Sequence, residues 1–167
     1  LVVGNATIHD TQPGGALTVA QVIQKSSNVG AAKMALAMPS EILWDMFSKV
    51  GFGVQPRSGF PGEVAGRLRA YKSWRPIEQA TMSYGHCISL GLLQLARAYL
   101  VFAGDGDIKP VTVVKLDAPV AGTQVISAET ALQVRRMLEL VVAPGGTAPL
   151  AQITGYRVAG KTGTAHK

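Results

Sequence analysis

The stretch GYRVAGKTGT, residues 155–164, constrains the fold more than any other part of the chain. Read as G-x-x-x-x-G-K-T, it is a nucleotide phosphate loop, in which a glycine-rich bend leads from a strand into a helix that begins at Lys161-Thr162. Read as K-T-G over residues 161–163, it is a strand motif of serine acyl-transfer enzymes. One lysine cannot serve both, because the two interpretations place different elements at the same residues.

The residues around Lys161 favour a strand. The bend of a phosphate loop would have to contain residues 156–159, a β-favouring run with bulky side chains. Gly163 follows Thr162, and glycine is a poor residue for the first turn of a helix. No apolar run closed by an aspartate follows to hold a metal ion. We therefore predict a strand over residues 153–165 and reject the nucleotide-binding hypothesis.

The rest of the chain is rich in helical patterns. Apolar residues recur at helical spacing, between capping and breaking residues, over residues 18–25, 29–38, 40–50, 92–103 and 127–143. Thr18 with Gln21 forms a capping-box pattern, and Ser40 and Ser127 are expected to cap their helices. Ser26-Ser27-Asn28 interrupts the first pair of helices, because short polar side chains bond nearby backbone and favour caps and turns.

The segments between the predicted helices are expected to be turns and loops. Residues 1–16 are Gly-rich and turn-like, and His9-Asp10 is interpreted as surface or turn. Residues 52–76 are expected to form a long ordered loop, because they are rich in Gly, Pro and Arg and show no helical or strand periodicity. Its apolar anchors are expected to be Phe60, Tyr71 and Trp74.

The second half of the chain is expected to add the sheet. Val111, Val113 and Val114 suggest a strand whose partner is Val125-Ile126. The helix over residues 92–103 is predicted to be almost wholly buried, with its leucines and the methionines in the core. With no internal repeat or domain boundary, the chain is predicted to be a helix-rich α+β domain.

Composition and charge limit the classes of protein to which the chain can belong. The 167 residues are 47% hydrophobic and 16% charged, as in one globular domain. We expect neither a membrane span nor a signal peptide, because no apolar run reaches 18 residues and no cationic leader opens the chain. The net charge of +6 favours an anionic partner such as nucleic acid, acidic lipid or an acidic cell-wall polymer. No metal or other cofactor is expected, because the three histidines lack ligand spacing.

Basic and aromatic residues alternate between residues 67 and 75, which imitates a nucleic-acid patch. We interpret them as an exposed, anchored loop, since no nucleic-acid-binding fold motif accompanies them.

Ser26 and Asn28 strengthen the acyl-transfer interpretation, because S-x-N accompanies K-T-G in this chemistry. A lysine beside a serine hydroxyl can move protons and place positive charge where a substrate carboxylate docks. Gly163 leaves room for an extended peptide, and the backbone N–H of Thr164 is available to an oxyanion. Asn28 offers a donor and an acceptor to a substrate amide. The simpler alternative is that Ser26 and Asn28 only cap helices.

Over essentially its whole length the chain resembles the transpeptidase domain of class B penicillin-binding proteins, most closely the division-specific member of proteobacteria. The segments that carry the resemblance are residues 17–38, 59–66, 74–85, 92–99, 144–147 and 155–167. It implies an α+β fold, with a helix-rich subdomain and part of the antiparallel sheet of the penicillin-binding and serine β-lactamase-like fold. Residues 1–167 are then a partial transpeptidase domain, truncated at both ends.

The resemblance also implies a function. The activity is a peptidoglycan D,D-transpeptidase that crosslinks septal stem peptides ending in D-Ala-D-Ala through a serine acyl-enzyme, and β-lactams acylate the same serine. Ser26 is then the relay hydroxyl, Lys161 the cleft cation and Asn28 the ligand of the substrate amide. Thr162 and Thr164 are carboxylate ligands, Thr164 also supplying the oxyanion N–H.

The resemblance implies that the protein lies on the periplasmic face of a bacterial inner membrane. An anchor helix outside this chain would hold it there. The implied partners are a septal glycan polymerase and other division proteins, with no nucleic acid.

Two departures from the family pattern matter. The S-x-x-K element with the nucleophilic serine is absent from residues 1–25, and neither Ser48 nor Ser73 begins one. The chain alone is therefore predicted to be inactive. The second departure is His86-Cys87, where relatives usually have Tyr-Gly after Tyr84-Gly85, in a loop beside the cleft. Cys87 should strain any position that needs a positive φ, while His86 can still stack on a substrate as an aromatic residue would.

Two other functions fit the same motifs. A β-lactam-sensing receptor keeps S-x-N and K-T-G and differs in its flanking domains. A serine β-lactamase needs an acidic residue that activates a deacylating water, and Glu63 and Glu78 stay open as candidates.

Overall fold

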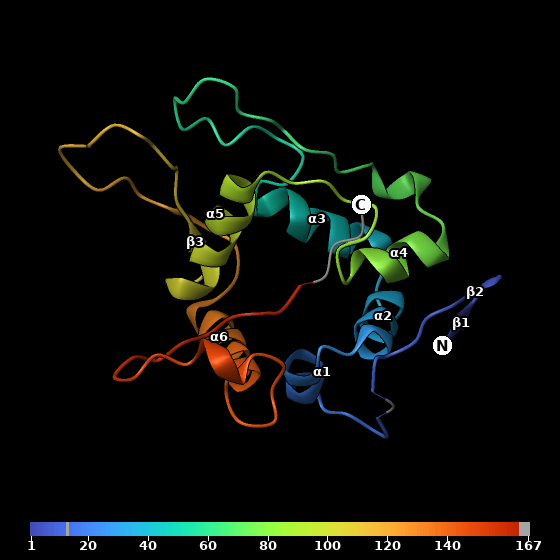
Figure 1. Ribbon diagram of the computed structural model, residues 1–167. Helices are drawn as coiled ribbons and strands as arrows, with labels where there is room; N and C mark the ends of the chain where they lie inside the picture. Colours follow the sequence, from blue (N-terminus) through green and yellow to red (C-terminus); the bar gives the residue numbers. More distant parts are fainter. Residues whose placement is uncertain (13, 164–167) are drawn as a thin grey trace.

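Six α-helices are the main regular elements in the computed structural model, which describes residues 1–12 and 14–163 (Figure 1). The α-helices are α1 (Val19–Lys25), α2 (Asn28–Leu36), α3 (Ser40–Lys49), α4 (Pro76–Met82), α5 (Leu92–Ala103) and α6 (Ala128–Val142). Two 3-10 turns are η1 (Tyr71–Ser73) and η2 (Pro149–Ala151). Within these residues no helix combines the length and the apolar character that crossing a bilayer requires.

Two short antiparallel sheets accompany the helices. In the first, β1 (Val2–Val3) pairs with β2 (Ala6–Thr7), and in the second, β3 (Asp107–Ile108) pairs with β4 (Thr123–Gln124). The mixed, helix-rich composition agrees with the predicted α+β class. The first sheet was not predicted, because residues 1–16 have the composition of turns.

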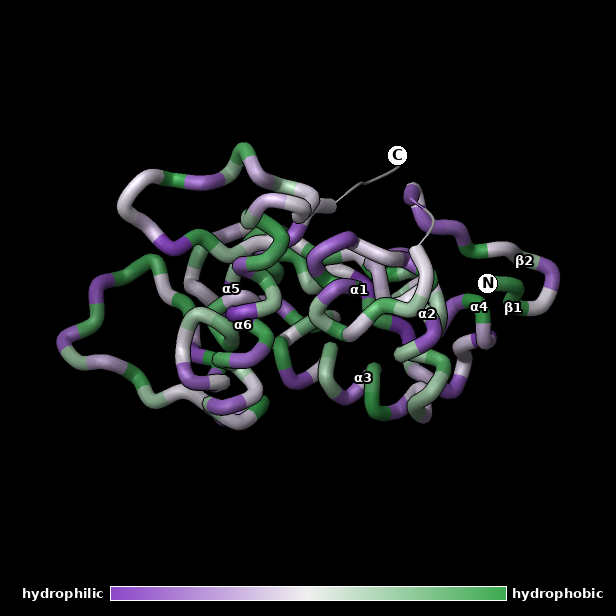
Figure 2. Tube along the Cα trace, turned by 90° about the horizontal axis from the view of Figure 1, so that it is seen from below, coloured by the Kyte–Doolittle hydropathy of each residue, from purple (hydrophilic) through white to green (hydrophobic). Residues whose placement is uncertain are grey.

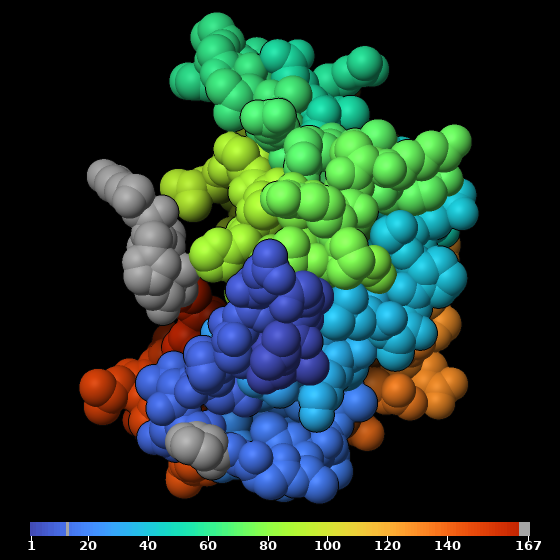
Figure 3. Space-filling view, turned by 90° about the vertical axis from the view of Figure 1, so that its right-hand side faces the viewer, coloured from blue at the N-terminus to red at the C-terminus, as the bar shows by residue number. Residues whose placement is uncertain are grey.

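The N-terminal hairpin covers one hydrophobic core. Val3 and Ile8 are buried with Ala32 of α2 and Ala80 of α4, and Tyr84 packs against the edge of this cluster. In Figure 3 the dark-blue N-terminal segment lies across the surface between α2 and α4. The hairpin therefore ties the start of the chain to α2 and α4.

A second core joins the end of α3 to α5 and β3. Val50 at the end of α3 packs with Ala98 and Val101 of α5 and with Ile108 of β3. Helix α6 packs against both α1 and α5, so it links the two halves of the molecule (Figure 1).

The long loop over residues 52–75 is ordered, as expected, but a polar residue holds it. The Gln94 side chain, 2% exposed, donates to the carbonyl oxygens of Val54 and Ala65 at 2.9 Å. The prediction that Phe60 anchors the loop was wrong, because this residue is 63% exposed. Trp74 does pack inward, and its Nε1 donates to the carbonyl of Arg69.

Helix α5 is less buried than its composition predicted. Only Gln94, Ala98 and Val101 are buried, at i, i+4 and i+7, which form one narrow stripe along the helix. Leu92 is 86% exposed, and Leu93, Leu95 and Leu100 are exposed as well. Figure 2 shows the apolar character of α5 in green. Periodicity identifies an apolar helix, but it does not reveal how many of its faces a neighbour covers.

Among the methionines the core prediction holds for Met82, which is 2% exposed, and fails for Met46, which is 38% exposed.

Three element predictions need correction. Ser40 is the first residue of α3, since Pro39 occupies the cap position and no side chain caps this helix. Residues 111–114 form a loop, because Pro110 cannot donate to a ladder and the pairing lies earlier, at Asp107–Ile108. The predicted strand over residues 153–165 is interrupted by a turn in which Tyr156 N–H donates to the Ile153 carbonyl, and residues 157–163 have no strand partner among the described residues.

Candidate active site

The junction between α1 and α2 is a tight turn centred on Ser26. Ser26 has φ 56° and ψ 47°, a left-handed conformation, and it ends α1. Such a conformation costs a residue with a side chain about 1–2 kcal/mol, so the surrounding contacts must maintain it. Ser27 then caps α2, because its Oγ accepts from Gly30 N–H at 2.9 Å. The predicted helix interruption at residues 26–28 is confirmed.

Gly30 allows α2 to approach α1 closely. A Cβ on Gly30 would lie 2.5 Å from the side chain of Val22, which is buried in α1. The two short helices are therefore packed together directly beside the turn that carries Ser26.

Asp10 fixes this turn from a distant part of the sequence. Its carboxylate accepts from the Ser27 hydroxyl at 2.6 Å and from Val29 N–H at 2.9 Å. The expectation that His9-Asp10 is surface or turn missed this role. A charged group beside the first turn of a helix is favourable, because the orphan backbone N–H groups there carry partial positive charge. No local pattern relates Asp10 to a helix that begins 18 residues later.

Lys161 reaches the same turn from the other end of the chain. Its Nζ lies 2.5 Å from Ser26 Oγ, 3.1 Å from the Thr162 carbonyl oxygen and 3.3 Å from Thr162 Oγ1. Partial burial lowers the pKa of Lys161 below its ordinary value, because removal of water disfavours the charged form. The structure thus brings together Ser26, Lys161 and Thr162.

Helix α6 provides the frame for these groups. Gly160 N–H donates to the carbonyl of Leu138 in α6 at 3.3 Å, directly before Lys161. Helix α6 also packs on α1, which ends at Ser26. Thr147, in the turn after α6, places its Oγ1 2.8 Å from Thr162 Oγ1. The sequence motifs did not identify Thr147 as a site residue.

The remaining predicted site residues lie around this cluster with fewer contacts. Asn28 opens α2 two residues after Ser26, and Gly163 follows Thr162 with open space where a side chain would be. Thr164 lies outside the described residues.

The loop after α4 is strained as expected. Gly85 has φ 99° and Cys87 has φ 63°, so Cys87 occupies a conformation that glycine prefers. Tyr84 and His86 stack edge to face, with their ring centres 5.5 Å apart. Burial raises the pKa of Tyr84. No hydrogen bond joins these two rings to Lys161 or Ser26 within the described residues.

The two acidic candidates for a deacylating base are both occupied by other groups. Glu63 accepts from the Ser58 hydroxyl and from the backbone N–H groups of Arg57 and Ser58, and the hydroxyl contributes most to lowering its pKa. The backbone N–H of Arg75, and then the Arg69 guanidinium at 2.5 Å, lower the pKa of Glu78 to about 2.

The basic loop is therefore partly neutralised by a carboxylate of α4, the helix that follows it. Arg69 and Arg75 both pair with Glu78, which agrees with an anchored loop.

The described contacts of Lys161 do not support the phosphate-loop interpretation, because its Nζ lies against Ser26 Oγ. No helix begins at Lys161 in the part of the chain that the structure describes, which ends at Gly163. A phosphate loop needs that helix, because its first N–H groups hold the phosphates. Among residues 1–12 and 14–163, no group of three or more His, Cys, Asp or Glu side chains gathers to hold a metal ion.

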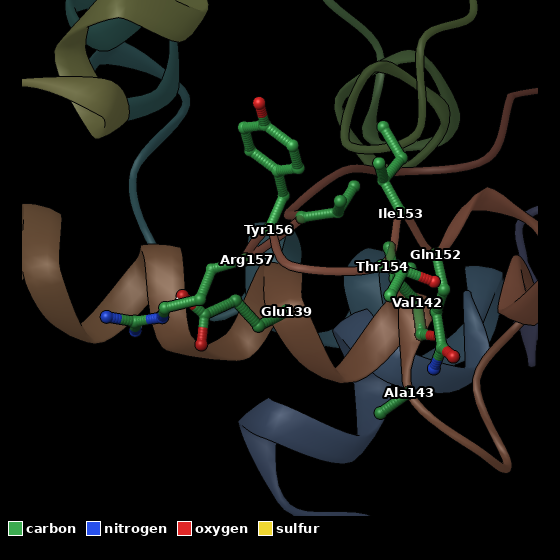
Figure 4. Close-up of a pocket in the computed structure, with 9 residues that line it drawn as sticks. Glu139, Val142, Ala143, Gln152, Ile153, Thr154, Tyr156 and Arg157 are labelled. Atoms are coloured by element: carbon green, nitrogen blue, oxygen red, sulfur yellow. The ribbon is translucent and has the colours of Figure 1, made fainter.

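Two open hollows lie outside the Lys161 cluster. One, of about 280 Å³, lies between α6 and the turn over residues 152–158. Figure 4 shows Arg157 beside Glu139, with which it forms an ion pair of 2.7 Å, while Tyr156 points away from α6. The other, of about 350 Å³, is lined by Arg67, Arg69, Glu78 and residues 87–89. Neither is lined by the groups that could perform acyl transfer, so size alone does not locate the chemistry.

Comparison with known proteins points to one family. A family model described as penicillin binding protein transpeptidase domain matches residues 2–167. The chain is 44% identical over 165 residues to the probable peptidoglycan D,D-transpeptidase PenA of Neisseria flavescens, covering 99% of this chain and 41% of that protein. It is 42% identical over 160 residues to the peptidoglycan D,D-transpeptidase FtsI of Escherichia coli K12, covering 96% of this chain and 27% of that protein.

A solved structure of a penicillin-binding protein also matches the whole chain. The apo structure of the TP domain of Burkholderia pseudomallei penicillin-binding protein 3 superposes with a TM-score of 0.97 at 53% identity, covering 100% of this chain and 51% of that chain. The chain thus spans less than half the length of the two relatives and about half of the solved structure.

Proposed function

The chain belongs to the penicillin-binding protein transpeptidase domain family, and on this premise we propose that the complete protein is a peptidoglycan D,D-transpeptidase of the division septum. The observation that carries the proposal is the 2.5 Å contact of Lys161 Nζ with Ser26 Oγ, which joins K-T-G to S-x-N across 135 residues. A cation beside a hydroxyl is the arrangement that can exchange protons during acyl transfer. The names of the two relatives point to the same reaction.

The reaction has two halves. The nucleophile is a serine of an S-x-x-K element, which these 167 residues do not contain and which the complete protein supplies. Its Oγ attacks the carbonyl carbon of the penultimate D-Ala, the peptide C–N bond breaks, and the terminal D-Ala leaves with a proton on its amine. An amine of a neighbouring stem peptide then attacks the resulting ester, loses a proton and forms the crosslink, while the serine hydroxyl is restored.

Ser26 and Lys161 move the proton in this scheme. Lys161 donates to Ser26 Oγ, so the hydrogen of the Ser26 hydroxyl is free to point toward the leaving nitrogen. The lowered pKa of Lys161 eases the exchange of a proton with Ser26. Its positive charge also attracts the carboxylate of the terminal D-Ala.

The other site residues bind the substrate. Asn28 holds a substrate amide, and Gly163 leaves room for an extended peptide beside residues 161–163. Thr162 and Thr164 bind the carboxylate, and the backbone N–H of Thr164 supports the oxyanion. Tyr84 and His86 belong to the loop at the edge of the cleft. These roles follow from the family pattern, and the contact of Thr162 with Lys161 supports the first of the two carboxylate ligands.

The occupied carboxylates weigh against a serine β-lactamase. Such an enzyme needs a free acidic group that activates water, and both Glu63 and Glu78 are engaged by backbone N–H groups and side chains. A β-lactam-sensing receptor is distinguished by turnover, because it does not crosslink peptides.

The proposed surroundings follow from the function. The substrates are stem peptides ending in D-Ala-D-Ala, and β-lactams act as inhibitors. The protein works on the periplasmic face of the inner membrane, held by an anchor outside this chain, with a septal glycan polymerase and other division proteins as partners. Nucleic acid and cofactors have no part in the proposal.

Labelling with a fluorescent penicillin tests the proposal. The complete protein should be labelled at the serine of its S-x-x-K element and should release D-Ala from a D-Ala-D-Ala peptide when an acceptor amine is present. The isolated 167-residue chain should not be labelled. Labelling of a serine in that chain, or rapid hydrolysis of nitrocefin by the complete protein, contradicts the proposal.

A further inference from the structure

We propose that Thr147 is a positioning residue, which holds the hydroxyl of Thr162 in the orientation that meets a substrate carboxylate. The inference rests on the proposed function. The two Oγ1 atoms lie 2.8 Å apart, the usual separation for a hydrogen bond between hydroxyl groups. Thr147 and Thr162 are 15 residues apart and lie in different segments, so the contact depends on the fold.

The backbone on both sides of Thr147 is fixed to α6. Gly146 N–H donates to the Ala143 carbonyl at 2.9 Å, and Ala148 N–H donates to the Val141 carbonyl at 2.9 Å. The turn can pass this close only because residue 146 is glycine, since a Cβ there would lie 2.2 Å from the Val141 carbonyl oxygen. Val141 itself is fully buried. Thr147 therefore presents its hydroxyl from a backbone that has little freedom.

Hydrogen-bond capacity explains what this hydroxyl can do. A threonine hydroxyl has one hydrogen and two acceptor positions. Lys161 Nζ lies 3.3 Å from Thr162 Oγ1 and uses one acceptor position. When the Thr147 hydroxyl donates to the second acceptor position of Thr162 Oγ1, Thr147 cannot also accept the hydrogen of the Thr162 hydroxyl. That hydrogen is then directed outward, where a carboxylate oxygen of the substrate can accept it.

The position of the pair suits an anionic group. The same Lys161 ammonium also donates to Ser26 Oγ, so the outward hydrogen of Thr162 lies beside the positive charge and the relay hydroxyl. A carboxylate bound there is attracted by both groups. Thr147 need not touch the substrate, because it acts through Thr162.

Variants of the complete protein test this role through the second-order rate of acylation by a fluorescent penicillin, whose carboxylate is the probe. Thr147→Val keeps the shape and removes the hydroxyl, and it should slow acylation about 3- to 10-fold, the equivalent of one hydrogen bond. Thr147→Ser keeps the hydroxyl and should stay within about twofold of the unmodified protein. Thr154→Val is the matched control and should leave the rate unchanged, since Thr154 is exposed and makes no hydrogen bond in the described part of the chain.

A double variant separates positioning from a general structural effect. If Thr147 acts through Thr162, Thr147→Val combined with Thr162→Val should be no slower than Thr162→Val alone. Equal rates for Thr147→Val and the unmodified protein, or effects that multiply in the double variant, overturn the role of Thr147 alone. An unmodified protein that is not acylated overturns the proposed function and this inference with it. Thermal unfolding is measured for each variant, and if Thr147→Val does not fold, Thr147→Ala against Thr147→Ser gives the same comparison.

Discussion

Replacing Asp10 by alanine should weaken both the fold and the site. The change removes the acceptor of two hydrogen bonds, from Ser27 Oγ at 2.6 Å and from Val29 N–H at 2.9 Å. Hydrogen bonds to a charged group contribute about 1.5–3 kcal/mol each, but Asp10 is half-buried and water can replace part of this. We therefore expect the free energy of unfolding to fall by about 2–4 kcal/mol. Asp10→Asn keeps one acceptor and should lose about half as much.

The site should respond in the same direction. Ser26 holds its left-handed conformation one residue before Ser27, so a looser turn displaces the hydroxyl that Lys161 contacts. Acylation by a fluorescent penicillin should slow by about tenfold or more, since small displacements of a reacting group have large effects on rate.

The assay is denaturant-induced unfolding of the complete protein, followed by tryptophan fluorescence, together with the acylation rate. Asp45→Asn is the matched control. It removes an exposed ion pair with Lys49 on α3, and such pairs contribute about 0.5 kcal/mol or less. If Asp10→Ala unfolds like Asp45→Asn and is acylated at the unmodified rate, the reasoning about Asp10 is refuted.

Three further variants test other parts of the structure. Gln94→Leu should destabilise the protein by about 2–4 kcal/mol and increase proteolysis within residues 52–66, because the carbonyl groups of Val54 and Ala65 lose the buried donor that holds the loop; intact, uncut protein would contradict this. Cys87→Gly should raise the free energy of unfolding by about 1 kcal/mol, since φ is 63°, whereas Ser83→Gly at φ −61° should lower it. The pKa of Glu78 is lowered from 4.5 to about 2, so its stabilising effect is complete above about pH 4.5 and is lost as the pH falls toward 2. Glu78→Gln should therefore show a smaller decline in unfolding temperature between pH 5 and pH 2, and parallel curves would argue against this assignment.

Local chemistry made the helices and their junction predictable. Thr18 and Gln21 form the predicted capping box, Ser127 caps α6, and both signals lie within four residues of the helix they begin. The interruption at residues 26–28 is equally local, because serine and asparagine side chains bond their own neighbourhood. The motif pair S-x-N and K-T-G indicated that Ser26 and Lys161 share a site, although no spacing along the chain relates them.

Contacts between distant segments explain what the sequence did not reveal. Asp10 accepts hydrogen bonds from the first turn of α2 and Thr147 contacts Thr162, and both contacts exist only after the fold has formed. The strand predictions failed for a related reason, since a β-favouring segment such as residues 111–114 forms a strand only where a partner edge is present. Apolar periodicity likewise identified α5, but the buried stripe proved to be narrow and to begin at a polar residue, Gln94.

The most direct test concerns the contact between Lys161 and Ser26. Acylation of the complete protein by a fluorescent penicillin is measured for Ser26→Ala, Lys161→Met and the double variant, each with its unfolding temperature. Each single change should slow acylation by about 100-fold or more while the protein stays folded, and the double variant should be no slower than the slower single one, because the two groups act as a unit. A folded single variant that is acylated at the unmodified rate, or two losses that multiply, would show that these residues do not work together.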